Sequence, residues 1–315
     1  MLGDYSWWEA GLFAVLVAVA LIIDIRTHRE NKPIDTKEAA LWSAIWISLG
    51  LAFGIYVGFQ HGHQDSLLYI TAYLLEKSLS VDNLFVMMAV FTAFSIKNAY
   101  QHRILYYGIL GAIIFRMIFI AAGVSFMEVF GKYALGIFGL IILWSAWKMW
   151  KASCKDNEEI TDYSHHWSVK LTGKIFPVHH FLDGHNFFTK QNSRTMVTPL
   201  FLCLVTIEAA DIMFAFDSIP AVLGVVGTPP NPFIVYTSNI FAILGLRSLY
   251  FLLAAAKNYL SHLEIAVIII LLFVGAKMIL GLFDIHIHYL ISLCVVIGLL
   301  ALGVIVSLVK PEQKA

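Results

Sequence analysis

Nine apolar segments, each long enough to cross a bilayer, restrict this chain to a membrane protein. A hydrocarbon core of ~30 Å needs about 20 apolar residues in a helix. Only 13% of the residues are charged, against about 25% in a soluble domain. The chain is therefore predicted to be an all-α polytopic membrane protein with transmembrane helices at residues 7–25, 38–59, 66–94, 102–124, 131–150, 197–226, 232–256, 262–283 and 288–309.

The positions of lysine and arginine predict the orientation of these helices. Basic residues occur mainly in alternate loops, from Arg26 after the first segment to Lys310 and Lys314 at the end, whereas the loops QHGHQD and VGTPPNPF contain none. Because cytoplasmic loops are enriched in lysine and arginine, the N-terminus is expected outside and the C-terminus in the cytoplasm. The first segment lacks a basic stretch and a cleavage site, which predicts an anchored helix rather than a signal peptide. The expected location is the bacterial inner (plasma) membrane.

Charge and motif content argue against several functions. The net charge is +0, which gives no basis for a nucleic-acid partner. The widely spaced Cys154, Cys203 and Cys294 predict neither a disulfide framework nor a zinc site. A phosphate-binding GxxxxGK[ST] loop is missing from the sequence, so ATP-driven pumping is disfavoured. The polar segment 151–196 is interpreted as a cytoplasmic linker, although metal sensing or proton collection stays open because it contains His165, His166, His179, His180 and His185.

An internal repeat relates two halves of the chain. LLEKSLSVDNLFV (74–86) aligns with EAADIMFAFDSIP (208–220) without a gap, which matches Glu76 with Asp211, Asp82 with Asp217 and Asn83 with Ser218. Arg116 then matches Arg247, and Lys148–Met149 matches Lys277–Met278. Each unit covers three segments, so the second unit must cross the membrane in the opposite sense, as in many secondary transporters. The predicted organisation is two helices in 1–65, a three-helix repeat in 66–150, the loop 151–196, an inverted repeat in 197–283, and a last helix with its tail in 284–315.

Five acidic residues inside the predicted helices form the candidate functional site: Glu76, Asp82, Glu208, Asp211 and Asp217. A charge at a helix centre costs about 2.5–3.5 kcal/mol, so the set costs on the order of 10–15 kcal/mol before compensation. At about 100° per residue, Glu208 and Asp211 share one face, whereas Asp217 lies about 120° from it. A helix break at Pro220 is expected to let these acids converge.

Three interpretations of the acids differ in what compensates them. A structural ion-pair network would use Lys77, Arg116, Arg247 and Lys277, a relay would use protons, and a transport site would use a bound cation. The clustering on two repeat-matched helices favours a cation, with the basic residues as counter-charges. Asn83, Ser218 and Asn239 are additional candidate ligands. Oxygen ligands suit Mg²⁺, Ca²⁺ or Mn²⁺ rather than zinc or copper, and composition does not choose among the three.

The stretches YLLEKSLSVDNLFV, TPLFLCLVTIEAADIMFAFDSIPA and FIVYTSNIFAILGLRSLYFLL resemble the TerC family of integral membrane proteins, in particular its Alx-like members. The resemblance covers roughly residues 7–309. It implies an association with tellurite resistance, with the response to alkaline pH and with manganese export. It also places the family's acidic positions on the five acids above, its TSN motif on Asn239 and the arginine of its GLR motif on Arg247, with Arg116 as the repeat mate.

The leading hypothesis is a secondary transporter that exports Mn²⁺ from the cytoplasm through a carboxylate site in mid-membrane, with proton exchange as one form of coupling. Its partners would be the divalent ion and the lipid bilayer, with no cofactor. An intramembrane aspartyl protease, with Asp82 and Asp217 as a dyad, lacks the Gly-x-Gly-Asp context, and no enzyme is predicted. A membrane scaffold, or a tellurite-resistance or pH-stress component without transport of its own, remains the alternative.

Overall fold

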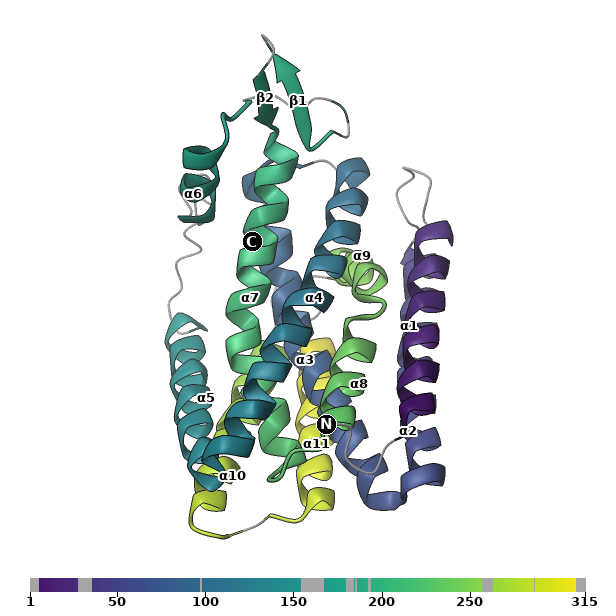
Figure 1. The fold of residues 1–315 in the computed structure, drawn as a ribbon, viewed down its shortest axis with the longest axis vertical. Helices are drawn as coiled ribbons and strands as arrows, with labels where there is room; N and C mark the ends of the chain where they lie inside the picture. Colours follow the sequence, from purple (N-terminus) through teal and green to yellow (C-terminus); the bar gives the residue numbers. More distant parts are fainter. Residues whose placement is uncertain are drawn as a thin grey trace.

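The fold is a bundle of long helices with a small β-hairpin at one end, seen in a computed structural model (Figure 1). The structure describes residues 6–27, 36–96, 98–153, 167–179, 184, 186–191, 194–256, 263–285 and 287–309. The helices of its N-terminal half are α1 (Trp7–Thr27), α2 (Thr36–His61), α3 (His63–Ala93), α4 (Asn98–Phe130) and α5 (Lys132–Ser153). They are followed by α6 (Trp167–Ile175), β1 (Phe188–Gln191), β2 (Arg194–Val197), α7 (Pro199–Val226), α8 (Pro232–Ile243), α9 (Leu246–Ala256), α10 (Leu263–Leu282) and α11 (Tyr289–Val309).

The number of spans depends on how two special cases are counted. In the described residues, 7 helices are long and apolar enough to cross a membrane, and α8 with α9 brings the number to 8 when this bent pair is one span. The chain is thus an all-helical polytopic membrane protein. The predicted ninth span corresponds to α3, whose 31 residues include Glu76, Lys77 and Asp82. These charges keep α3 out of the apolar set, so the count of nine stays a prediction.

The central helices are α3, α4 and α7, with α1 and α2 on one side and α5 on the other (Figure 1). Helix α4 packs along α7, α8 packs on α3, and α5 packs along α10. The α5–α10 contact is close because glycines replace side chains on both helices. A Cβ at Gly139 would lie 3.1 Å from the Gly275 carbonyl oxygen, and a Cβ at Gly275 would lie 3.3 Å from that of Gly139. Small residues permit such approach of helices in membranes.

The predicted break at Pro220 is wrong, and a break occurs elsewhere. Helix α7 continues through Pro220 to Val226. Proline removes one backbone hydrogen bond, and a membrane helix tolerates this loss when neighbouring helices support it; α3, α4, α5 and α10 all pack on α7. The predicted span 232–256 instead divides into α8 and α9, which meet at 46°. Gly245 lies at this bend with a φ of 78°, a conformation that favours glycine.

The segment predicted as a linker contains structure of its own. Helix α6 packs on α7, and β1 pairs with β2 in antiparallel register from Phe188 opposite Val197 to Gln191 opposite Arg194. Of its five histidines, His179 donates its backbone N–H to the Val197 carbonyl at 2.8 Å. The other four, His165, His166, His180 and His185, lie outside the described residues.

Candidate functional site

An arginine joins two of the predicted acids at the centre of the bundle. Arg116 of α4 forms an ion pair with Glu76 of α3. On its other side, its Nη2 lies 3.1 Å from Asp211 Oδ1 and its Nε lies 3.5 Å from Asp211 Oδ2. The fork of the guanidinium thus contacts both oxygens of Asp211, an arrangement that fixes geometry as well as charge. One side chain therefore links α3, α4 and α7.

This triad contains two acidic side chains and one basic side chain. The side chains of Arg116, Glu76 and Asp211 are 0%, 0% and 4% exposed. With both acids ionised, two carboxylates face one guanidinium, and the buried group has a net charge of about −1 by the usual ionisation states. An uncompensated buried charge is strongly unfavourable. The arrangement is suited to hold a further cation or a proton.

Glu208 extends the acidic face of α7 by one turn. Its carboxylate lies against Gly111 of α4, where a Cβ would collide with all three carboxyl atoms. Glu208 is half-buried, and its Oε2 has no hydrogen-bond partner among the described residues. Glu208 and Asp211 therefore both face α4, as predicted from helix geometry. Gly111 provides the space for the carboxylate.

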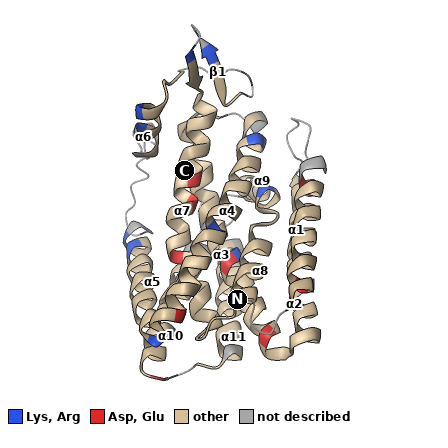
Figure 2. Cartoon of the chain, viewed as in Figure 1, with Lys and Arg blue, Asp and Glu red and all other residues tan. Residues whose placement is uncertain are grey.

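Asp217 faces a different helix from the other acids of α7. Its Oδ1 accepts a hydrogen bond of 2.5 Å from the Ser145 hydroxyl of α5. The step of six residues from Asp211 to Asp217 turns the side chain away from α4, and the continuous helix through Pro220 does not bring it back. Figure 2 shows acidic positions along α7 inside the bundle, whereas basic positions lie mostly near helix ends and on the β-hairpin.

The predicted uncharged ligands are all buried. Asn83 Nδ2, Ser218 Oγ and Asn239 Oδ1 have no hydrogen-bond partner within the described ranges. Buried polar atoms are nearly always paired. Ser218 Oγ and Asn239 Oδ1 are oxygens that a cation could bind, whereas Asn83 Nδ2 is a hydrogen-bond donor and would need an acceptor instead. Asp82 lies in α3, but its side chain is outside the described part of the chain.

Among the described side chains, Arg116 is the one of the four predicted counter-charges that forms an ion pair with a predicted acid. Lys77 donates to the carbonyl oxygens of Ala242 at 3.0 Å and Leu244 at 3.2 Å, at the bend between α8 and α9. Arg247 pairs with Asp24 of α1 at 3.1 Å. Lys277 is partly buried, and no carboxylate of a described residue lies within ion-pair distance of it.

Three contributors were missed by the sequence analysis: Asp24, Ser145 and Gly111. Asp24 is the one acid near the C-terminal end of the first predicted helix (7–25), which is a signal that was available. A lone serine or glycine in an apolar helix gives no comparable signal, because its role depends on which helix lies opposite.

The described side chains do not form one compact metal centre. Among them, no group of three or more His, Cys, Asp or Glu side chains is close enough to hold a metal ion. The acids instead form a triad with Arg116, a carboxylate at Gly111 and a carboxylate at Ser145. A single centre containing all five acids stays a prediction.

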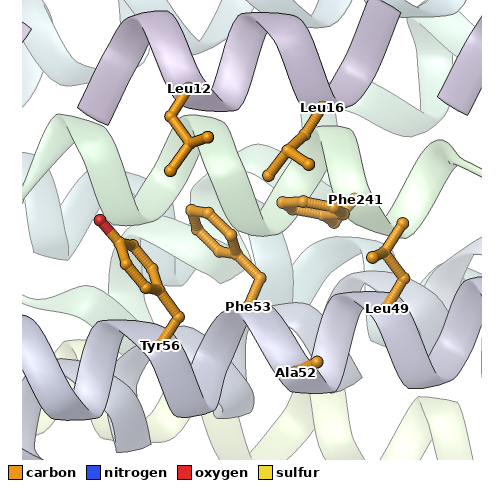
Figure 3. Close-up of a pocket in the computed structure, with 7 residues that line it drawn as sticks. All are labelled: Leu12, Leu16, Leu49, Ala52, Phe53, Tyr56 and Phe241. Carbon is orange, nitrogen blue, oxygen red and sulfur yellow. The ribbon is translucent and has the colours of Figure 1, made fainter. Parts of the chain in front are cut away.

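A groove of about 240 Å³ between α1, α2 and α8 is not a candidate for ion binding (Figure 3). Apart from the Tyr56 hydroxyl its side chains are apolar: Leu12, Leu16, Leu49, Ala52, Phe53 and Phe241. A hard cation needs oxygen ligands, which this surface does not supply.

Comparison with known proteins places the chain among integral membrane proteins. Residues 61–315 match the model of the integral membrane protein TerC family. A tellurium resistance protein TerC from Serratia marcescens is 43% identical over 96% of this chain and 95% of its own length. A Shigella flexneri protein named as a membrane-bound redox modulator, Alx, is 40% identical over 94% and 93%. The chloroplast thylakoid membrane protein TERC of Arabidopsis thaliana is 42% identical over 81% and 65%. No solved structure matches.

Proposed function

Because the chain belongs to the TerC family of integral membrane proteins, we propose that it is a secondary transporter that exports a hard divalent cation, Mn²⁺, from the cytoplasm. The observation that carries this proposal is the buried triad of Glu76, Arg116 and Asp211. It concentrates negative charge where no solvent compensates it. A protein with a purely structural need would neutralise such a site completely or fill it with apolar side chains.

The chemistry of the surrounding side chains supports a hard cation. The groups near the middle of α3, α7 and α8 offer carboxylate oxygens from Glu76, Glu208 and Asp211, and amide or hydroxyl oxygens from Asn239 and Ser218. Mn²⁺, Mg²⁺ and Ca²⁺ prefer this set, whereas zinc and copper prefer imidazole and thiolate. The choice of Mn²⁺ among the three rests on the family resemblance.

The packing supports an inverted repeat. A two-fold relation that exchanges the unit α3–α4–α5 with α7–α8/α9–α10 requires each contact to have a counterpart. The contact of α4 on α7 corresponds to that of α8 on α3. The contact of α5 with α10 would be its own counterpart at the level of whole helices. With α3 as a ninth span, this gives an external N-terminus and a cytoplasmic C-terminus.

In the proposed cycle, Arg116 moves away from one carboxylate when the cation arrives. The guanidinium then stays near the other carboxylate, and the net charge of the triad with both acids ionised changes from about −1 without the ion to about +1 with it. Rocking of the two repeats would open the site to the outside. Protonation of a freed carboxylate would couple export to inward proton movement.

The test is Mn²⁺ flux in sealed proteoliposomes, with Ca²⁺ and Mg²⁺ as competitors and a pH gradient across the membrane. Asp211→Asn is expected to abolish flux, because it removes one of the two charges that attract the ion. Asp284→Asn is the matched control, since Asp284 is an exposed acid that pairs with Lys132 at 2.9 Å outside the site. Wild-type flux in Asp211→Asn would overturn the proposal.

A second candidate is a membrane component without transport, such as a tellurite-resistance or pH-stress scaffold. The ion pairs of Arg116 favour it, because they already occupy both central acids. The same vesicles distinguish the two functions. A scaffold would show no flux of any of the three ions in wild-type protein, even though the folded protein is present in the bilayer.

A further inference from the structure

Helix α6 exposes its apolar side chains and buries its polar ones. Ser168 and Thr172 are 2% and 7% exposed, whereas Leu171 and Ile175 are 51% and 65% exposed. A helix on a water-covered surface would have the opposite orientation, with leucine and isoleucine packed against the protein and the polar side chains in water. The exposed face of α6 is therefore built for contact with an apolar medium.

The position of α6 brings this face to the membrane. Ser168 Oγ lies 3.1 Å from Thr206 Oγ1 of α7, and Thr206 belongs to the apolar stretch Pro199–Val226 that is long enough to cross a bilayer. The polar face of α6 is thus satisfied by α7 at the level of a membrane-spanning segment. Leu171 and Ile175 flank this contact and remain exposed beside α7, where we expect lipid to surround the bundle.

Basic residues lie beside the apolar ones on α6. Lys170 and Lys174 are both exposed and lie one turn apart. At 100° per residue they form a stripe next to Leu171 and Ile175. An apolar stripe beside a lysine stripe is typical of a helix in the plane of a membrane interface.

The end of α5 carries a similar surface. Trp144, Trp147 and Trp150 are each more than half exposed, and Lys151 Nζ lies 5.3 Å from the centre of the Trp147 ring. Tryptophan and lysine concentrate at the level of lipid headgroups. Both α5 and α6 pack on α7, so the two surfaces lie on the same supporting helix.

We propose that α6 is an interfacial helix that docks on anionic phospholipid headgroups of the leaflet it faces, with Leu171 and Ile175 in the acyl region and Lys170 and Lys174 on the phosphates. The lysines match the negative charge of such lipids, and the apolar stripe matches the hydrocarbon below them. The segment between the repeats is thereby a membrane-anchored element rather than a free linker. This inference does not depend on the transported ion.

Spin labels on the full-length protein test the placement. The background carries Cys154→Ser and Cys294→Ser; Cys203 is buried and is retained. Spin labels are attached to Leu171→Cys and to the control Gly173→Cys, which is an exposed position on another side of the helix. The labelled proteins are placed in phosphatidylcholine vesicles that contain about 30% phosphatidylglycerol, so that the membrane surface is strongly anionic. The label at 171 should collide more with oxygen than with a water-soluble nickel complex, and the label at 173 should show the reverse. Equal nickel access at both positions, or shielding of position 171 from both reagents as in a protein contact, would overturn the proposal.

A second experiment tests whether the lysines of α6 bind the negative charge of the lipid headgroups. In vesicles of pure phosphatidylcholine, or in the variant Lys170→Gln/Lys174→Gln, the oxygen preference at position 171 should decrease, since each lysine near an anionic surface strengthens association by on the order of fivefold. Lys190→Gln on the β-hairpin is the matched control and should leave the preference unchanged. If the oxygen preference at position 171 is the same in both lipid mixtures and in the double lysine variant, the assignment to anionic headgroups is overturned.

Discussion

The substitution Arg116→Gln tests whether this side chain compensates the buried acids. It removes the guanidinium from between Glu76 and Asp211, which are both almost completely buried. Removing one partner of a buried ion pair destabilises a protein by about 3–5 kcal/mol, and here two carboxylates lose the same partner. At about 2–4 °C per kcal/mol for a chain of comparable size, the midpoint of thermal unfolding should fall by about 6–20 °C.

The assay is thermal unfolding of the purified protein in detergent, with Arg194→Gln as the control because Arg194 is exposed on β2. The double variant Arg116→Gln/Glu76→Gln should be more stable than the sum of the single changes predicts, since the two residues interact directly. Saturating Mn²⁺ should raise the midpoint of Arg116→Gln more than that of the wild type, because a cation can then occupy the space between the carboxylates.

Two results would refute this reasoning. A midpoint for Arg116→Gln within about 2 °C of wild type, less than 1 kcal/mol, would mean that the acids are neutral or already compensated without Arg116. Additive effects in the double variant would mean that Arg116 and Glu76 do not share the buried charge. A loss of stability without any response to Mn²⁺ would leave the triad as a structural network and support the scaffold function.

Two further predictions concern the acids of α7. Gly111→Ala should lower Mn²⁺ flux, because the added methyl group would collide with the Glu208 carboxylate. Gly108→Ala is the control and should not lower the flux, since its Cβ would meet no atom closer than 3.8 Å. Equal flux in both variants would contradict the role of Gly111. Ser145→Ala removes the hydrogen bond to Asp217 and should destabilise the protein by about 1.5–3 kcal/mol. Ser145→Thr keeps a hydroxyl and should lose less stability, and thermal unfolding measures both variants. An unchanged unfolding midpoint in Ser145→Ala would show that the hydroxyl is dispensable.

Most of the helical architecture could be predicted from apolar segment length. Helix α4 extends to Asn98–Phe130, beyond the predicted 102–124, because polar residues can continue a helix past the apolar window. The bend at Gly245 was missed, although a glycine inside the span offered a signal. At Pro220 a break was predicted where the helix is continuous, because the four helices packed on α7 support it despite the proline.

Spacing in the sequence predicts where each acid lies on its own helix, but it does not predict which helix faces that acid. Helix geometry correctly separates Asp217 from Glu208 and Asp211, because angular position on one helix depends on spacing alone. Which helix lies opposite each acid does not depend on spacing. For this reason Arg116 could be identified as a counter-charge, but the pairing of Arg247 with Asp24 and of Lys77 with two backbone carbonyls could not.

The glycine contact between α5 and α10 has a consequence for biogenesis. Synthesis proceeds from the N-terminus, so α5 enters the membrane while α10 is still unmade, and the backbone around Gly139 faces lipid until Gly275 arrives. The first half of the protein therefore cannot complete its packing alone. Nascent chains that stop before α10 should be recognised as unfinished by the cell's membrane proteases, whereas chains that stop after it should persist.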